Sequence, residues 1–221
     1  MRNLLLLLAV LLALAPPLTA QNWSVGVHSG AYVFGDLIER RLKPATSGET
    51  TGTVTMTLSA ATRAGLAVDV EHELADRWAL RLEGTFTRAP LTVEIDGSEG
   101  PAMDAGEVDV STFTLPLVFR INPRGALRFH LMGGPAYALY RVTGKPNASG
   151  ITPLDESSGE FGLMAGAGAA WWLGKQLAVE GMISDVVTSS PFDREDLPAG
   201  PGWSVPRPHN VHTTVGVRWR F

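Results

Sequence analysis

From residue 21 to its end, the chain mostly alternates apolar side chains with polar or small ones. The run 210–221 shows this most clearly, because Val215, Val217 and Trp219 share one parity while Gly216 and Arg218 share the other. Successive side chains of a β-strand point to opposite faces, whereas a helix repeats its apolar positions about every 3.6 residues. The alternation therefore predicts an all-β chain whose strands are apolar on one face.

Eight runs carry this period of two, and turn-forming residues separate them. The runs span residues 23–34, 60–72, 78–88, 108–121, 127–140, 161–172, 176–187 and 210–221. The links alternate between short ones, at 74–77, 122–125 and 173–175, and long polar ones, at 35–59, 89–107, 142–158 and 188–209. This rhythm predicts antiparallel neighbours with both chain ends on the short-turn side. Pro116 lies inside the fourth run, so a bulge or a local bend is expected there.

Residues 1–20 have the organisation of an export signal and are set apart from the fold. Arg2 precedes an apolar run over 4–15, which two prolines and then small residues end. That run is shorter than the roughly 20 residues that a membrane-spanning helix needs. We predict a signal peptide over 1–20, cleaved before Gln21, and one domain over 21–221. An uncleaved N-terminal membrane helix is the alternative.

Composition excludes several classes of function. The chain has no cysteine, so disulfides, a thiol nucleophile and cysteine-based metal sites are absent. Its formal charge of −4 shows no basic excess, and no nucleic-acid partner is expected. The five histidines have no recognisable metal-ligand spacing, so we expect neither a metal nor another cofactor.

An exported all-β chain is either a membrane barrel, apolar outside, or a soluble sandwich or lipocalin-like barrel, apolar inside. Aromatic residues near the ends of the apolar faces favour the membrane, because Trp and Tyr suit membrane–water interfaces. In such a barrel the polar faces fill the interior with charges of both signs that neutralise one another. The predicted interior network consists of Arg63, Asp69, Glu71, Arg81, Glu83, Arg128, His130, Glu160, Glu180 and Arg218.

The segment 215–221 resembles the terminal strand of bacterial outer-membrane barrels, which end in an aromatic residue after apolar residues at alternate positions. Residues 67–78 and 131–137 also resemble the second hairpin and the Gly-rich fifth strand of the small OmpA/OmpX/OmpW-like barrels. The positions that match the terminal signature are Val215, Val217, Trp219 and Phe221.

The resemblance implies an eight-stranded antiparallel up-and-down transmembrane β-barrel in the outer membrane. It also implies contact with outer-membrane lipid and lipopolysaccharide, and a terminal strand that the barrel assembly machinery reads. We expect the barrel to be a monomer.

We expect a non-catalytic role. The protein would serve as a structural component of the envelope, as a narrow pore, or in interactions at the cell surface. Eight strands leave an interior only just wide enough for side chains, so a plugged barrel is favoured over a conducting one. The alternatives are a lipid-modifying barrel enzyme of the lipid A deacylase or acyltransferase type, and a soluble periplasmic lipocalin-like binding protein. An enzyme needs a nucleophile within reach of a base, but His28 and Ser29 point to opposite faces of a regular strand.

Overall fold

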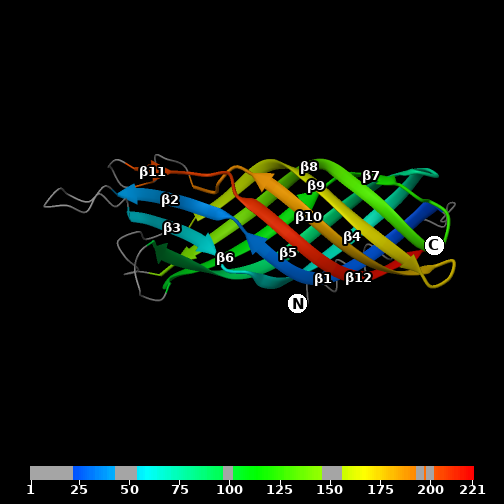
Figure 1. The fold of residues 1–221 in the computed structure, drawn as a ribbon, viewed down its shortest axis with the longest axis horizontal. Coiled ribbons are helices and arrows are strands. Elements are labelled where there is room, and N and C mark those ends of the chain that lie inside the picture. Colours follow the sequence, from blue (N-terminus) through cyan, green and yellow to red (C-terminus); the bar gives the residue numbers. More distant parts are fainter. Residues whose placement is uncertain (1–21, 43–53, 97–101, 146–155, 193–196, 198–201) are drawn as a thin grey trace, which may run out of the picture.

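The computed structural model describes residues 22–42, 54–96, 102–145, 156–192, 197 and 202–221, most of them in antiparallel strands (Figure 1). The predicted signal peptide, 1–20, lies outside the described residues. Within the described part of the chain, no helix is long and apolar enough to cross a membrane. The strands are β1 (Trp23–Phe34), β2 (Asp36–Leu42), β3 (Val54–Ala60), β4 (Arg63–Ala75), β5 (Trp78–Ile95), β6 (Met103–Thr114), β7 (Leu117–Arg120), β8 (Leu127–Gly144), β9 (Glu156–Trp172), β10 (Leu177–Thr188), β11 (Trp203–Ser204) and β12 (His209–Arg220).

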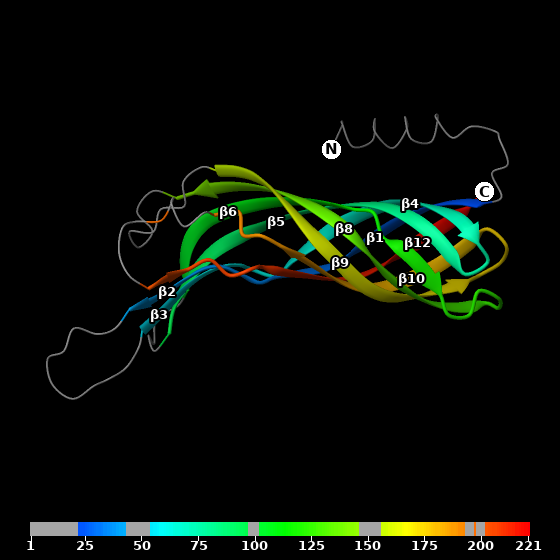
Figure 2. The same ribbon diagram turned by 90° about the horizontal axis from the view of Figure 1, so that it is seen from above.

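The main strands close into a ring. β1 pairs with β4 on one side and with β12 on the other, and the ring continues through β5, β8, β9 and β10. β6 and β7 follow each other in one position of the wall, between β5 and β8, so the ring has eight positions. Figures 1 and 2 show these strands winding around one long axis. The predicted all-β, eight-stranded antiparallel up-and-down barrel is confirmed.

The first and last strands of the ring meet beside the short turns. Ser24 pairs with Arg220, and the backbone N–H of Phe221 donates to the carbonyl of Trp23 at 3.0 Å. Trp23 in turn pairs with His72, near the turn between β4 and β5. The prediction that β1 starts and β12 ends on the short-turn side is therefore confirmed.

The prediction of a single loop over 35–59 is wrong, because this segment contains β2 and β3. The two strands pair with each other, and β3 also pairs with the far part of β5. Leu37, Ile38 and Leu58 are buried in an apolar cluster of this region. β5, β8 and β9 are likewise longer than predicted on the long-link side. The wall therefore continues beyond the predicted strands as a folded outer rim.

Pro116 separates β6 from β7, but the expected bulge is absent at this position. Thr114 pairs with Glu83 and Leu117 pairs with Leu80, so the register with β5 is the same on both sides of the proline. Proline lacks an N–H and removes one ladder hydrogen bond, yet its neighbours stay in line. The interruption is local.

Two glycines sit where neighbouring strands come unusually close. A Cβ at Gly134 would lie 2.5 Å from the carbonyl oxygen of Leu115, beside the interrupted strand. The register shift between β5 and β6 falls instead between Leu91 and Thr92, opposite Gly106. Gly106 has φ of 130°, a region that side chains rarely adopt, so glycine permits this bulge.

Large apolar side chains cover the outer face of the ring. Around the terminal strand, Val215 is 61% exposed, Val217 52%, Trp219 44% and Phe221 37%. The same holds for outward residues of the other ring strands, while charged side chains on the opposite faces are buried. Exposed apolar surface on this scale matches a lipid-facing band. Its polarity is the reverse of that of a soluble lipocalin-like barrel, and this alternative is rejected.

Deleting Phe221 removes its hydrogen bond to Trp23 and the last aromatic side chain of the outward row. Because β12 closes the ring against β1, we expect less protein to insert and fold in the membrane. The measurement is the heat-modifiable fraction on SDS gels of membrane preparations. Phe221→Tyr keeps the aromatic ring and should insert normally. Full insertion of the truncated chain would contradict this role.

Candidate functional site: the charged interior of the barrel

The polar faces of the ring strands meet inside the barrel, in the half near the short turns. Because inward positions alternate along each strand, residues two apart in one strand face neighbours across the ladder. Thus Glu71 of β4 lies opposite Arg81 of β5, and Asp69 lies opposite Glu83. Five members of the predicted network come together here, each at most 3% exposed: Asp69, Glu71, Arg81, Glu180 and Arg218.

Arg81 links the carboxylates of two distant strands. Its Nε and Nη2 donate to Oε2 of Glu71 at 2.9 and 2.6 Å, and Nη2 also donates to Oε1 of Glu180 at 2.9 Å. Its Nη1 contacts the sulfur of Met182 at 2.8 Å. β5 and β10 are not neighbours in the ring, so this guanidinium group ties the wall together across the interior.

Arg218 of β12 makes a second set of bridges. Its Nε donates to Oε2 of Glu180 at 2.8 Å, its Nη2 to Oδ1 of Asp69 at 2.7 Å, and its Nη1 to Oγ of Ser24 at 3.0 Å. Glu180 is therefore shared by both arginines, one on each carboxylate oxygen. Hydrogen bonds between such ionised groups are stronger than neutral ones, and here they lie away from solvent.

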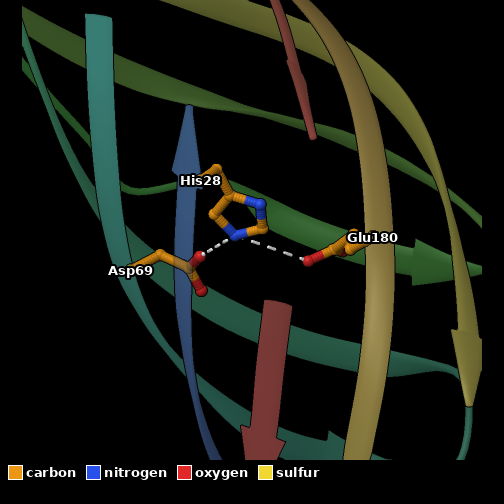
Figure 3. Close-up of side chains that lie close together, drawn as sticks. All are labelled: His28, Asp69 and Glu180. Carbon is orange, nitrogen blue, oxygen red and sulfur yellow. Dashed lines mark hydrogen bonds and ion pairs between the residues drawn. The ribbon is translucent and has the colours of Figure 1, made fainter. Parts of the chain in front are cut away.

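His28 of β1 completes the cluster and is missing from the predicted network. Its Nε2 lies 2.8 Å from Oδ2 of Asp69 and 3.7 Å from Oε2 of Glu180 (Figure 3). The imidazole is buried, whereas neighbouring Ser29 is exposed, which confirms that the two point to opposite faces. The signal for His28 was its place on the polar face of β1, between Gly26 and Gly30.

The network continues toward the short turns through Arg120, Glu73 and Arg220, which lie outside the predicted set. Arg120 of β7 bonds Oε1 of Glu71 at 2.6 Å and Oε1 of Glu73 at 2.8 Å. Arg220 of β12 also donates to Glu73. Arg120 and Arg220 were detectable by parity, since each continues the polar face of its strand.

The other predicted members lie apart from this cluster or at its edge. Arg63 is exposed at the start of β4 and has no ion pair among the described residues. The guanidinium of Arg128 lies 4.8 Å from the ring centroid of Trp172. Glu160 accepts a hydrogen bond from Ser158 at 2.9 Å.

Two further predicted residues border the cluster. His130 has its Nε2 3.4 Å from Oε1 of Glu180. Glu83 is buried, and its Oε2 has no hydrogen-bond partner in the described structure.

His28, Asp69 and Glu180 offer donor atoms within 4.8 Å of one another, a spacing that a metal ion can use. The guanidinium of Arg218, however, already bonds both carboxylates. A cation placed among the three donors would lie beside this positive charge, so it would bind only if Arg218 moved away. As it stands, the cluster is an ion-pair network rather than an open ligand set.

No family model matches the chain, and no curated protein matches it in sequence. Solved structures do match its fold. The outer membrane protein OprG from Pseudomonas aeruginosa superposes with a TM-score of 0.56 at 14% identity, over 91% of this chain and 97% of that chain. Neisserial surface protein A (NspA) superposes with a TM-score of 0.50 at 10% identity, over 90% and 97% of the two chains. The chain thus has the fold of the small outer-membrane β-barrels, and its apolar belt agrees with the predicted outer-membrane location.

Replacing Arg81 with Met removes one of the two arginine partners of Glu71 and of Glu180, so the buried carboxylates outnumber the remaining guanidinium groups. Met fills much of the same space. We expect a loss of about 3–5 kcal/mol in the free energy of unfolding. The control is Arg63→Met, an arginine chosen by the same sequence pattern but exposed, which should change stability by less than about 0.5 kcal/mol. Urea unfolding in lipid vesicles measures both. Equal effects of the two substitutions would refute the network's structural role.

Proposed function

We propose that this protein is a closed, non-catalytic outer-membrane barrel with a structural and surface-interaction role. The observation that carries this proposal is the double closure of its interior. A layer of paired charges fills the half near the short turns, and an apolar core fills the half near the rim.

The charged layer leaves little freedom for solutes. Arg81 and Arg218 reach across the interior and are held by carboxylates from β4 and β10. An ion passing through would have to separate these buried pairs, which is costly in a region of low dielectric constant.

The apolar layer closes the opposite half. Tyr32, Leu37, Leu91 and Tyr140 belong to one buried cluster inside the outer part of the wall, and each is at most 1% exposed. The hydroxyl of Tyr140 is held by Thr188 at 2.9 Å and by an amide from β12. Apolar side chains packed together exclude water, so a continuous aqueous path would need both layers to open.

The rim supports the surface-interaction part of the proposal. It is folded rather than formed only of loops, because β2 and β3 continue the sheet and β11 pairs with β2. The guanidinium of Arg40 lies 4.6 Å from the ring centroid of Trp203. Lys145 hydrogen-bonds Asp104, which holds the pKa of that carboxyl below its usual value. Such a rim presents defined side chains to a partner.

Conductance across a planar bilayer tests the closed barrel. We expect no channel activity from the wild type, because both layers are closed. Insertion is verified in the same preparation by the heat-modifiable shift. Discrete, ion-selective openings of the wild type would overturn the proposal and favour a narrow pore.

A lipid-modifying activity is tested at the exposed His209, whose Nδ1 lies 2.7 Å from Oδ2 of Asp185. In the described residues, no hydroxyl bonds the other ring nitrogen of His209, so the pair lacks the nucleophile that catalysis needs. We expect mass spectra of lipid A to be the same from cells producing wild type, His209→Ala or no protein. A change in acylation that depends on His209 would contradict the non-catalytic role.

A further inference from the structure

A groove of about 560 Å³ runs across β5, β6, β8 and β9. None of the residues that line it belongs to the charged interior network. The cross-strand register orders its outward side chains into rows. In one row Arg88, Asp109, Arg141 and Ser157 stand side by side, one from each strand. These outward positions belong to the outer surface of the barrel, on the long-link side.

The next outward row toward the short turns is largely apolar. It contains Phe86, Ser111 and Leu139, and all three line the groove. The row below holds Phe113, Tyr137 and Phe161 in direct register. Phe161 is 80% exposed and its ring centroid lies 4.9 Å from that of Tyr137.

The groove therefore lies at the boundary between the apolar belt and the polar rim. Aromatic side chains are typical of membrane–water interfaces, and the row of arginines begins directly above them. Below this boundary the outward positions are apolar; above it, the next row contains Pro90, Glu107 and Thr143. Going up from the apolar belt along these rows, Arg88 and Arg141 are the first positive charges.

The row of Arg88, Asp109, Arg141 and Ser157 contains two positive charges and one negative charge. Arg88 forms a two-point pair with Asp109, from Nε at 2.5 Å and from Nη2 at 2.9 Å. Arg141 lies on the other side of Asp109 and has no hydrogen bond or ion pair among the described residues. The row thus holds two guanidinium groups but one carboxylate, which leaves a net positive charge and an arginine with all its donors available.

We propose that this groove binds the phosphate group of a phosphorylated lipid of the outer leaflet. Arginine matches phosphate geometry with paired N–H donors, and Arg141 supplies them at the depth of the headgroups. Phe86 and Leu139 continue the groove into the belt, where an acyl chain packs against them. The inference rests on the membrane placement of the barrel but not on its closure, so a conducting barrel would leave it intact.

Native mass spectrometry of the refolded full chain in detergent tests the site. The probes are diphosphoryl lipid A and the same lipid with one phosphate removed. We expect the diphosphoryl form to be retained more strongly by the wild type. Arg141→Gln should weaken its retention about tenfold, because a charge-assisted contact is lost. Asp109→Asn should strengthen it, because the negative charge that holds Arg88 and would repel a phosphate group beside Arg141 is removed.

The matched control is Arg124→Gln, since Arg124 is an exposed arginine at a short turn whose partner Asp76 lies 3.4 Å away. This variant should retain lipid like the wild type, and all variants must keep the heat-modifiable shift. Unchanged retention in Arg141→Gln, or an equal loss in Arg124→Gln, would overturn the assignment. Displacement of the lipid by inorganic phosphate would also overturn it, by showing a site for the free ion rather than for a lipid.

Discussion

Buried charge is the constraint on which the interior of this barrel depends. The carboxylates of Asp69, Glu71 and Glu180 lie out of water, where an unpaired charge is strongly unfavourable. Arg81 and Arg218 satisfy them together, since each arginine bonds carboxylates from two different strands. The network therefore holds strands on different sides of the ring at fixed distances from one another, in addition to the backbone pairing between neighbours.

The outside of the wall follows the opposite rule. In hydrocarbon every backbone polar group needs a partner within the protein, and a closed ring of strands provides it. Side chains then separate by parity, apolar outward and polar inward, in the half near the short turns. In the rim the interior becomes apolar instead, around Leu91 and Tyr140, because the wall there surrounds a core of its own. One continuous sheet thus encloses a charged interior near the short turns and an apolar interior in the rim.

Parity along the sequence was enough to predict the eight positions of the wall and five of the buried central charges, while closure into a ring was implied by the resemblance to small outer-membrane barrels. It was not enough to predict how far along the barrel axis each inward side chain lies. Three predicted members have the inward parity but lie toward the ends of their strands: Arg63, Arg128 and Glu160. Their position along the barrel axis depends on how neighbouring strands are staggered, and alternation within one strand does not reveal this stagger. Arg120 was missed because it follows the interruption at Pro116. The hairpin of β2 and β3 was missed because its short alternation is embedded in polar sequence.

The order of the network along the chain has a consequence for how the barrel forms. Asp69, Glu71 and Arg81 lie early in the sequence, Glu180 comes late, and Arg218 is only three residues from the last residue. A sheet that has formed β1 to β10 but not β12 therefore faces its own interior with an excess of negative charge. Docking of the last strand neutralises Asp69 and Glu180 in the same step that completes the wall. Pairing of β12 with β1 and neutralisation of the buried carboxylates are therefore coupled, so we expect a ring open at this seam to be less stable than the closed one.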